Sequence, residues 1–140
     1  MSQENWNPEP IEPPGWPRPI GYANGMTIPA GAGLIVVAGQ VGWDENQHFS
    51  PEFIDQWRQA LSNVMTVVHT GGGTAASIAS MTIYVTDKQA YLSDLKAIGT
   101  AWKEVVGRHF PAMALVEVAA LVEDDAMVEI QALASVKGEG

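Results

Sequence analysis

The stretch HFPAMALVEVAALVEDDAMVEIQALASV, which runs from His109 to Val136, decides the fold class of this chain. Pro111 marks the start of one predicted strand, and residues 127–136 form another. The acidic run Glu123–Asp125 lies between them, and we interpret it as a solvated hairpin turn in preference to a cation site. Both strands carry apolar side chains on both faces, so each face of their sheet needs to be covered.

Three more strands are predicted upstream, after a proline-rich arm. The arm, residues 1–19, holds six of the nine prolines, which predicts an extended segment without a regular ladder. Its two tryptophans predict that part of the arm packs on the domain or on a neighbouring subunit. The strands are predicted at residues 20–27, 34–38 and 81–86, from their β-branched runs or their alternation of apolar with polar residues.

Two helices are predicted between these strands. The first begins at residues 50–51, where Ser50 is the expected N-cap, and it ends at the glycines of residues 71–73. Because those glycines end a helix, we do not interpret them as a phosphate-binding loop, which would begin one. The second runs from Asp87, again an expected N-cap, to Gly107. The two apolar stripes consist of Ile54, Trp57, Leu61, Val64 and Val68, and of Leu92, Leu95, Ile98, Trp102 and Val105.

These patterns predict an α+β, two-layer domain over residues 20–140, after the arm of residues 1–19. Each helix has a single apolar stripe, so both are expected on one face of one mixed β-sheet. The opposite face also carries apolar residues, among them Leu133, and no helix remains to cover it. We therefore expect this face to be buried against another copy of the chain.

Composition limits the partners and the chemistry. The net charge of −9, with seven Lys and Arg residues in all, disfavours nucleic acids and anionic membrane surfaces. The absence of cysteine excludes disulfides, thiolate metal sites and a cysteine nucleophile. The three histidines show no ligand spacing, so no metal and no cofactor are expected. An acidic, proline-rich N-terminus is unlike a secretory signal, and no run of residues is apolar enough to span a membrane, so we expect a cytoplasmic protein.

One carboxylate in the opening stretch is a candidate catalytic group. Glu129 is framed by apolar residues and shares its strand face with Met127, Gln131 and Leu133. If that face meets another subunit, the carboxylate is partly desolvated and suited to transferring a proton or holding a water. The alternative is that Glu129 accepts backbone hydrogen bonds or lies at an edge, and the sequence leaves both interpretations open.

Several short segments, taken in order, resemble the RidA/YjgF family over about residues 18–136. They are Pro19-Ile-Gly-Tyr22, Val37-Ala-Gly-Gln40, Gln59-Ala-Leu-Ser-Asn-Val64, Tyr84-Val-Thr-Asp87, Phe110-Pro-Ala112, Val116-Glu-Val118 and Val128-Glu-Ile-Gln-Ala132. The resemblance implies a chorismate-mutase-like fold, a homotrimer with the sheets packed around its axis, and three clefts between subunits that bind a small metabolite. It also implies hydrolysis of enamines and imines, such as 2-aminoacrylate, to a keto acid and ammonia.

In the family mechanism, an arginine directly after Phe-Pro-Ala grips the substrate carboxylate and a glutamate on the last strand positions the attacking water. Glu129 matches this glutamate, and Tyr22 matches, to within a residue, a tyrosine that lines the cleft. Met113 stands in place of the arginine. Three further substrate-binding positions also differ from the family pattern: Ala38, Gly99 and Leu115 replace a small polar residue, an asparagine and a cysteine.

The change at Met113 alters the expected chemistry. A thioether cannot replace a bidentate guanidinium–carboxylate pair, and loss of such a charge from a half-buried anion site costs about 3–5 kcal/mol. We therefore expect poor activity on small 2-imino acids. Either Arg18 or Arg108 replaces the lost cation, or the ligand is less anionic. The competing interpretation, that both arginines are solvated surface charges, is preferred from sequence.

The resemblance thus implies a trimeric, metabolite-binding protein whose reaction, if it has one, is hydrolytic deamination of an imine or enamine with Glu129 holding the water. A binding or interaction protein without turnover is the alternative. The ribonuclease or translation-inhibitor role assigned to some relatives is least favoured, because the chain is strongly negative and shows no histidine pair.

Overall fold

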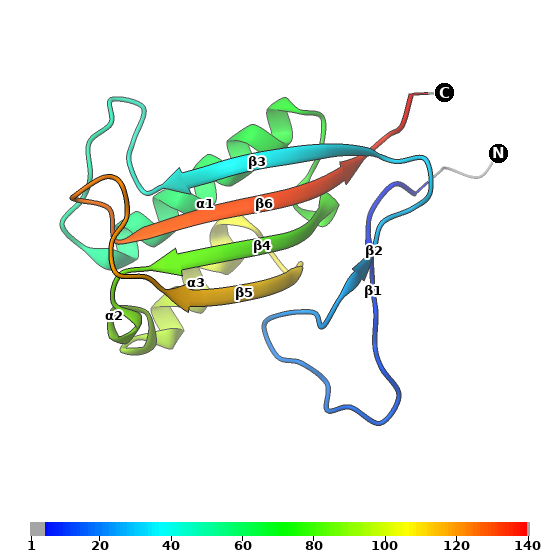
Figure 1. Cartoon of the computed structure of the whole chain (residues 1–140), viewed down its shortest axis with the longest axis horizontal. Helices are drawn as coiled ribbons and strands as arrows, with labels where there is room; N and C mark the ends of the chain where they lie inside the picture. The colour runs from blue at the N-terminus through cyan, green and yellow to red at the C-terminus, as the bar shows by residue number, and fades with distance from the viewer. Residues whose placement is uncertain (1–4, 140) are drawn as a thin grey trace.

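The central sheet has four strands in a computed structural model that describes residues 5–139. These are β3 (Gly33–Val41), β4 (Ile78–Val85), β5 (Ala112–Glu117) and β6 (Val128–Val136). Their spatial order is β3-β6-β4-β5 (Figure 1). Strand β6 is antiparallel to both of its neighbours, whereas β4 and β5 are parallel, so the sheet is mixed as predicted. Residues 1–4 of the predicted arm and residue 140 of the predicted domain lie outside the described residues.

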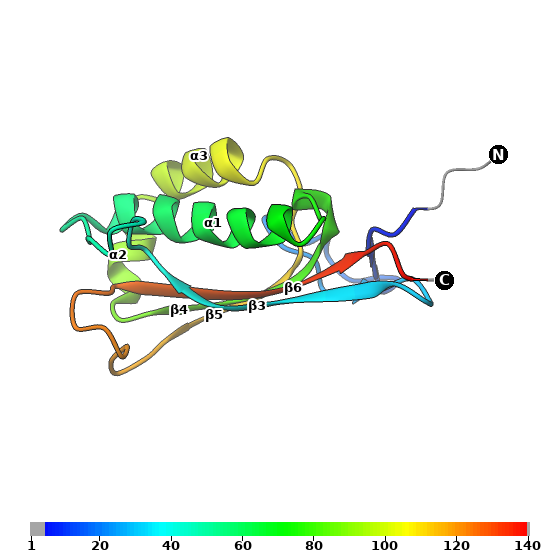
Figure 2. The same ribbon diagram turned by 90° about the horizontal axis from the view of Figure 1, so that it is seen from above.

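Both long helices pack on the same face of this sheet (Figure 2). They are α1 (Phe53–Thr70) and α3 (Leu95–Val105), with the short helix α2 (Lys88–Leu92) before α3 and a 3-10 turn, η1 (Ala75–Ser77), before β4. The predicted two-layer α+β fold is therefore confirmed.

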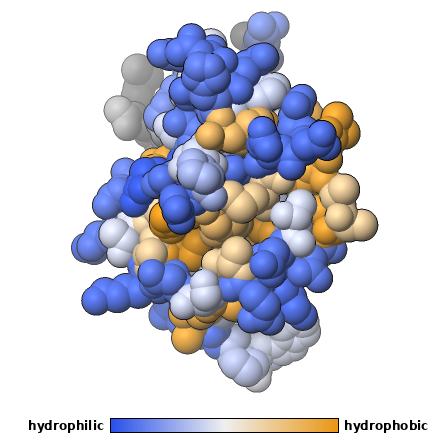
Figure 3. Space-filling model, turned by 90° about the vertical axis from the view of Figure 1, so that its left-hand side faces the viewer, coloured by the Kyte–Doolittle hydropathy of each residue, from blue (hydrophilic) through white to orange (hydrophobic). Residues whose placement is uncertain are grey.

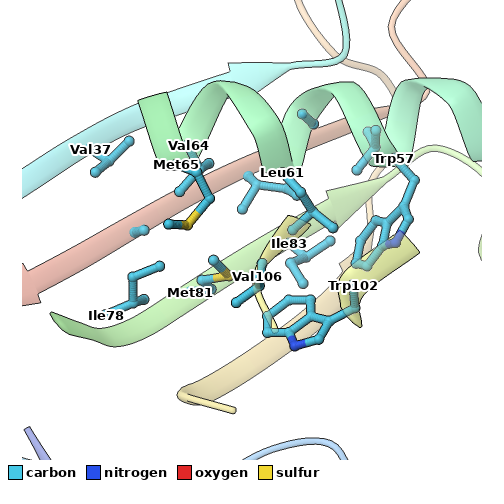
Figure 4. Packing of buried hydrophobic residues seen from close by; sticks show 14 of the residues in the cluster. Val37, Trp57, Leu61, Val64, Met65, Ile78, Met81, Ile83, Trp102 and Val106 are labelled. Atoms are coloured by element: carbon cyan, nitrogen blue, oxygen red, sulfur yellow. The ribbon is translucent and has the colours of Figure 1, made fainter. Parts of the chain in front are cut away.

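The core lies between the helices and this face of the sheet. Trp57, Leu61 and Val64 of α1 are buried there with Ile83 of β4 (Figure 4). Ile130 of β6 belongs to the same buried cluster. Truncating a buried leucine or isoleucine of this kind to alanine typically costs about 2–5 kcal/mol. Apolar residues recur every three or four positions on the helices and every second position on the strands. Both sets of side chains therefore meet in a single apolar layer.

The opposite face of the sheet is open and partly apolar. Leu34 and Val36 of β3 are 55% and 77% exposed, and Val116 of β5 is also exposed. Within residues 5–139 no helix covers this face. The sequence pattern therefore predicted correctly that two helices leave one face uncovered.

The acidic run Glu123–Asp125 does not form a hairpin turn, which corrects the prediction from sequence. It lies in the connection between β5 and β6, but β4 separates these two strands in the sheet. The reason is the crossover through α2 and α3, which returns the chain parallel to β4 and places β5 at the sheet edge. Strand β6 then enters between β3 and β4.

The second predicted helix is broken into two. Asp87 caps α2 by accepting a hydrogen bond from the Gln89 backbone N–H at 2.9 Å, as expected. Asp94 caps α3 in the same way, from the Ala97 N–H at 3.1 Å, so a new helix begins there. Short acidic side chains compete with the helical backbone for such donors. As a result Leu92 and Leu95, expected on a buried stripe, are exposed.

The first helix begins later than predicted. Glu52 is its N-cap residue and Phe53 its first helical residue, so Pro51 precedes the helix. The Ser50 hydroxyl accepts a hydrogen bond from the Glu52 N–H at 3.1 Å and donates one to Asp55 at 2.9 Å. Ser50 therefore organises the turn before the helix.

The N-terminal segment also differs from expectation. Of the predicted strand at residues 20–27, β2 (Met26–Thr27) is the part that forms, and it pairs with β1 (Glu9–Pro10) of the arm. The arm thus has a two-residue ladder where none was predicted. The expected contact of the arm with the domain is present, because the Ser135 hydroxyl donates a hydrogen bond to the Trp6 carbonyl at 2.6 Å.

Candidate functional site

Glu129 lies on the open face of the sheet. Its neighbours Val128 and Ile130 point into the core and are fully buried, so Glu129 points away from the helices and is half-buried. Its strand partners are Val41 on β3 and Tyr84 on β4, which places it in the middle of the sheet. Within residues 5–139 its carboxylate takes part in no ion pair.

A bulge in β3 makes room for this carboxylate. The pairing of β3 with β6 shifts register between Val37 and Gln40, and the bulge contains Ala38 and Gly39. A Cβ atom at Gly39 would lie 2.8 Å from the carboxyl carbon of Glu129. Real Cβ atoms do not approach other atoms so closely, so the carboxylate occupies this position because residue 39 has no side chain. Ala38 is exposed beside it.

Met113 and Leu115 lie on the other side of the sheet from Glu129. Both pack against the core from β5, and their register partners Met81 and Ile83 on β4 are core residues. Within one chain, Met113 and Glu129 therefore face opposite layers. A single copy of the chain does not bring these two candidate site residues together.

A pocket of about 610 Å³ opens beside Met113 on the helix side. Met113 and Gly99 are the predicted site residues that line it, whereas Tyr22, Ala38, Leu115 and Glu129 lie outside its lining. Figure 3 views the end of the molecule where α2 lies, and there apolar side chains gather in the middle of the surface with polar ones around them. The remaining lining residues are Ile20, Gly21, Trp57, Ile83, Tyr91, Leu95, Ile98, Trp102, Lys103, Gly107, Arg108 and Phe110.

Four aromatic side chains form a continuous row along this pocket. Trp57 contacts Tyr91 edge-on at 5.6 Å between ring centroids, and it lies 6.5 Å from Trp102. Trp102 stacks on Phe110 at 5.9 Å with the planes 7° apart. The indole N–H groups of Trp57 and Trp102 donate to the carbonyls of Ile98 and His109, respectively. Both rings are almost fully buried in the core (Figure 4), so the half-buried Tyr91 and the exposed Phe110 present most of the aromatic surface in the pocket.

Sequence reasoning assigned Trp57 and Trp102 to the core and did not place Tyr91 or Phe110 in a site. Trp57 and Trp102 fit a helical core stripe, so the sequence held no separate signal for a pocket there. Burial raises the pKa of the Tyr91 phenol above its usual value near 10. At neutral pH Tyr91 therefore keeps its hydroxyl proton and remains a hydrogen-bond donor within an otherwise apolar wall.

A second pocket, of about 420 Å³, adjoins the first and contains Tyr22, Arg18 and Arg108. The two pockets share Gly21, Arg108 and Phe110. The segment before Tyr22 is held there because the Ala23 N–H donates to the Pro111 carbonyl at 3.0 Å, beside the start of β5. Arg108 thus borders both pockets, while Arg18 belongs to the second.

The described part of the chain contains no group of three His, Asp or Glu side chains that could hold an ion. His109 lies in the lining of the second pocket, but its Nε2 makes a 2.7 Å hydrogen bond with the Ile78 carbonyl.

None of the helices in residues 5–139 has the length and apolar character that crossing a membrane requires.

Comparison with known proteins identifies the family. The sequence profile described as endoribonuclease L-PSP matches residues 20–136, and the chain belongs to this family, which is also called RidA/YjgF. A RutC family protein of Haemophilus influenzae is 34% identical over 106 residues, which are 72% of this chain and 78% of the relative. The predicted family membership is therefore confirmed.

Solved structures agree with this assignment. The Rid-family protein YyfB from Yersinia pestis superimposes with a TM-score of 0.81 over 93% of this chain and 99% of its own, at 24% identity, which bears on the fold alone. TdcF from E. coli, solved with bound serine, is 28% identical, with a TM-score of 0.65 over 92% of this chain and 99% of its own.

Proposed function

We propose that the chain forms a homotrimer that binds a small metabolite in the clefts between subunits and hydrolyses its C=N bond. The opposite orientation of Met113 and Glu129 is the observation that carries this proposal. A site that uses both residues requires the open sheet face of one chain to meet the pocket side of another. The exposed apolar residues Leu34, Val36 and Val116 supply a face suited to such burial.

The proposed reaction is hydrolytic deamination. A water held by the Glu129 carboxylate adds its oxygen to the imine carbon, while its protons pass to the carboxylate and the imine nitrogen. The resulting tetrahedral alkoxide, which is a deprotonated carbinolamine, loses ammonia as its C–N bond breaks and its oxygen forms the C=O double bond of the carbonyl product. Glu129 returns its proton to the leaving nitrogen, so protons and electrons balance without a cofactor.

The ligand is proposed to be of amino-acid size, because the structure of TdcF contains bound serine. Met113 requires a substrate that differs from 2-aminoacrylate, because the thioether of Met113 cannot hold a carboxylate as a guanidinium does. We therefore propose a substrate other than the small, fully charged 2-aminoacrylate. A nucleic-acid substrate is disfavoured by the net charge of −9.

The test combines assembly with turnover. Sedimentation velocity of the purified chain is expected to give the mass of a trimer. Ammonia release is measured with 2-aminoacrylate and with imines of larger amino acids, for the wild type, for Glu129→Gln and for Glu123→Gln, a matched change in the loop before β6. Turnover lost in Glu129→Gln and kept in Glu123→Gln supports the proposal. Turnover that survives Glu129→Gln, or ligand binding with no turnover of any imine, contradicts the proposed reaction.

A further inference from the structure

We infer that the pocket beside Met113 binds the aromatic side chain of a 2-imino acid, and that Arg108 holds the carboxylate of this substrate. The inference rests on the proposed function and names its substrate class. The family pattern gives the anion-binding role to the residue at position 113. The inference assigns this role to Arg108, in the segment that follows α3.

The lining of the pocket fits an aromatic ring. Tyr91 and Phe110 line it above the buried rings of Trp57 and Trp102, and Met113 adds a polarisable thioether of the kind that packs well against rings. Its volume of about 610 Å³ lies within the usual range for ligand pockets. A substrate as small as 2-aminoacrylate would leave most of this apolar surface in contact with water, whereas a benzyl or indolyl group would cover it.

Gly99 keeps the pocket open. It lies within helix α3, where glycine is unfavourable by about 0.5–1 kcal/mol relative to alanine. A Cβ built on Gly99 meets no described atom within 4 Å, so packing within the chain does not require glycine there. Space at this position is instead available to a ligand, since Gly99 lines the pocket.

The charges around the pocket fit an anionic end group. Lys103 and Arg108 line it, and none of its described lining residues is acidic, although the chain has sixteen Asp and Glu residues. Together with Arg18 of the adjoining pocket, three of the seven cationic side chains gather here. Among the described residues neither Lys103 nor Arg108 forms an ion pair, whereas Arg58 pairs with Glu104 at 3.2 Å. Their charges are therefore available to a ligand.

Arg108 is better placed than Arg18 to hold the carboxylate. It borders both pockets and shares that border with Phe110, so one ligand can place its ring on the aromatic wall and its carboxylate on the guanidinium. Arg18 lies in the outer pocket, where Glu12 is also part of the lining. Tyr91 adds a neutral donor inside the aromatic pocket, and within residues 5–139 its hydroxyl makes no hydrogen bond.

The test measures binding of the carbonyl products, which does not depend on turnover. Isothermal titration calorimetry compares phenylpyruvate with pyruvate on the full-length protein. We expect phenylpyruvate to bind about tenfold to a hundredfold more tightly, from burial of the phenyl group. Arg108→Met should weaken phenylpyruvate binding by about tenfold to a hundredfold. Lys96→Met removes the same charge from α3 outside the pocket and should leave binding unchanged.

A second variant tests the pocket itself. Gly99→Leu places a side chain in the open space and should weaken phenylpyruvate at least about tenfold while circular dichroism shows an unchanged fold. Equal affinity for the two oxo acids, or insensitivity to both Gly99→Leu and Arg108→Met, overturns the inference. If that result accompanies turnover that depends on Glu129, the proposed function stands without this substrate class. If binding follows the expectation and no imine is hydrolysed, the proposed reaction fails and the pocket assignment stands.

Discussion

The carboxylate of Glu129 lies directly over Gly39, at a distance that leaves no room for a side chain on residue 39. A Cβ there would be 2.8 Å from both the carboxyl carbon and one carboxylate oxygen. The contact joins the bulge of β3 to the middle of β6, and it fixes where the proposed catalytic carboxylate stands above the open face of the sheet. Residue 39 therefore controls the position of Glu129 without being a reacting group.

Gly39→Ala should reduce turnover much more than stability. The new methyl group displaces the flexible end of Glu129, which costs less than about 1 kcal/mol of unfolding free energy, but it moves the carboxylate away from the water. Denaturant unfolding and ammonia release from an imine measure the two effects. Gly33→Ala, the same change elsewhere in β3, serves as the control. Unchanged turnover in Gly39→Ala would show that the position of the carboxylate is irrelevant.

Gly99→Ala should stabilise the folded chain. The position is helical and open, so alanine removes the cost of glycine in a helix, and the free energy of unfolding should rise by about 0.5–1 kcal/mol. Urea denaturation measures the change. A decrease in stability would mean that Gly99 is needed for packing, and its role in keeping the pocket open would lose its support.

Val36→Asp should prevent assembly. Val36 is 77% exposed on the open sheet face, so a carboxylate costs little in an isolated chain and much in a buried interface. Val122→Asp is the matched control, because Val122 is 96% exposed in the loop between β5 and β6. Sedimentation velocity should show monomers for the first variant and trimers for the second. Trimers in both would mean that a different surface forms the interface.

Tyr91 should make stability sensitive to alkaline pH. Its pKa is raised in the folded chain, so the folded state holds the phenol proton more tightly than the unfolded state does. This contribution is complete below about pH 10, the ordinary pKa of tyrosine, and is lost as the pH rises above it. Tyr91→Phe should therefore flatten the fall in stability above about pH 10, as measured by thermal unfolding. An unchanged alkaline profile would place the phenol in water.

The sequence allowed the fold class to be predicted because burial has a local signature. The stripe of Trp57, Leu61 and Val64 and the alternation around Ile83 each need one apolar layer, and together they define helices on one side of a sheet. Strand order has no such signature. That β4 lies between β5 and β6 follows from a crossover whose partners are distant in sequence, so the acidic run was mistaken for a hairpin turn.

The candidate site was only partly predictable. Glu129 and Met113 could be singled out from the motifs around them. That their side chains point to opposite faces of the sheet could not be predicted, because side chains alternate along a strand and the two residues lie on different strands. The aromatic pocket was missed because Trp57 and Trp102 fit a helical core stripe equally well. The start of α3 at the Asp94 cap, which separates it from α2, was not predicted either.

Subunit complementation tests most directly whether the site is shared between chains. Two variants are unfolded together in equal amounts and refolded: Glu129→Gln, which is expected to lose turnover, and Gly99→Leu, which is expected to bind the aryl group at least about tenfold more weakly. If each cleft takes its pocket from one subunit and its Glu129 from the next, each mixed trimer has one cleft with both intact parts, which is about a quarter of all clefts after random refolding. The mixture then regains turnover of an aryl 2-imino acid. A mixture in which mass spectrometry shows mixed trimers but no turnover returns would contradict a site built from two chains.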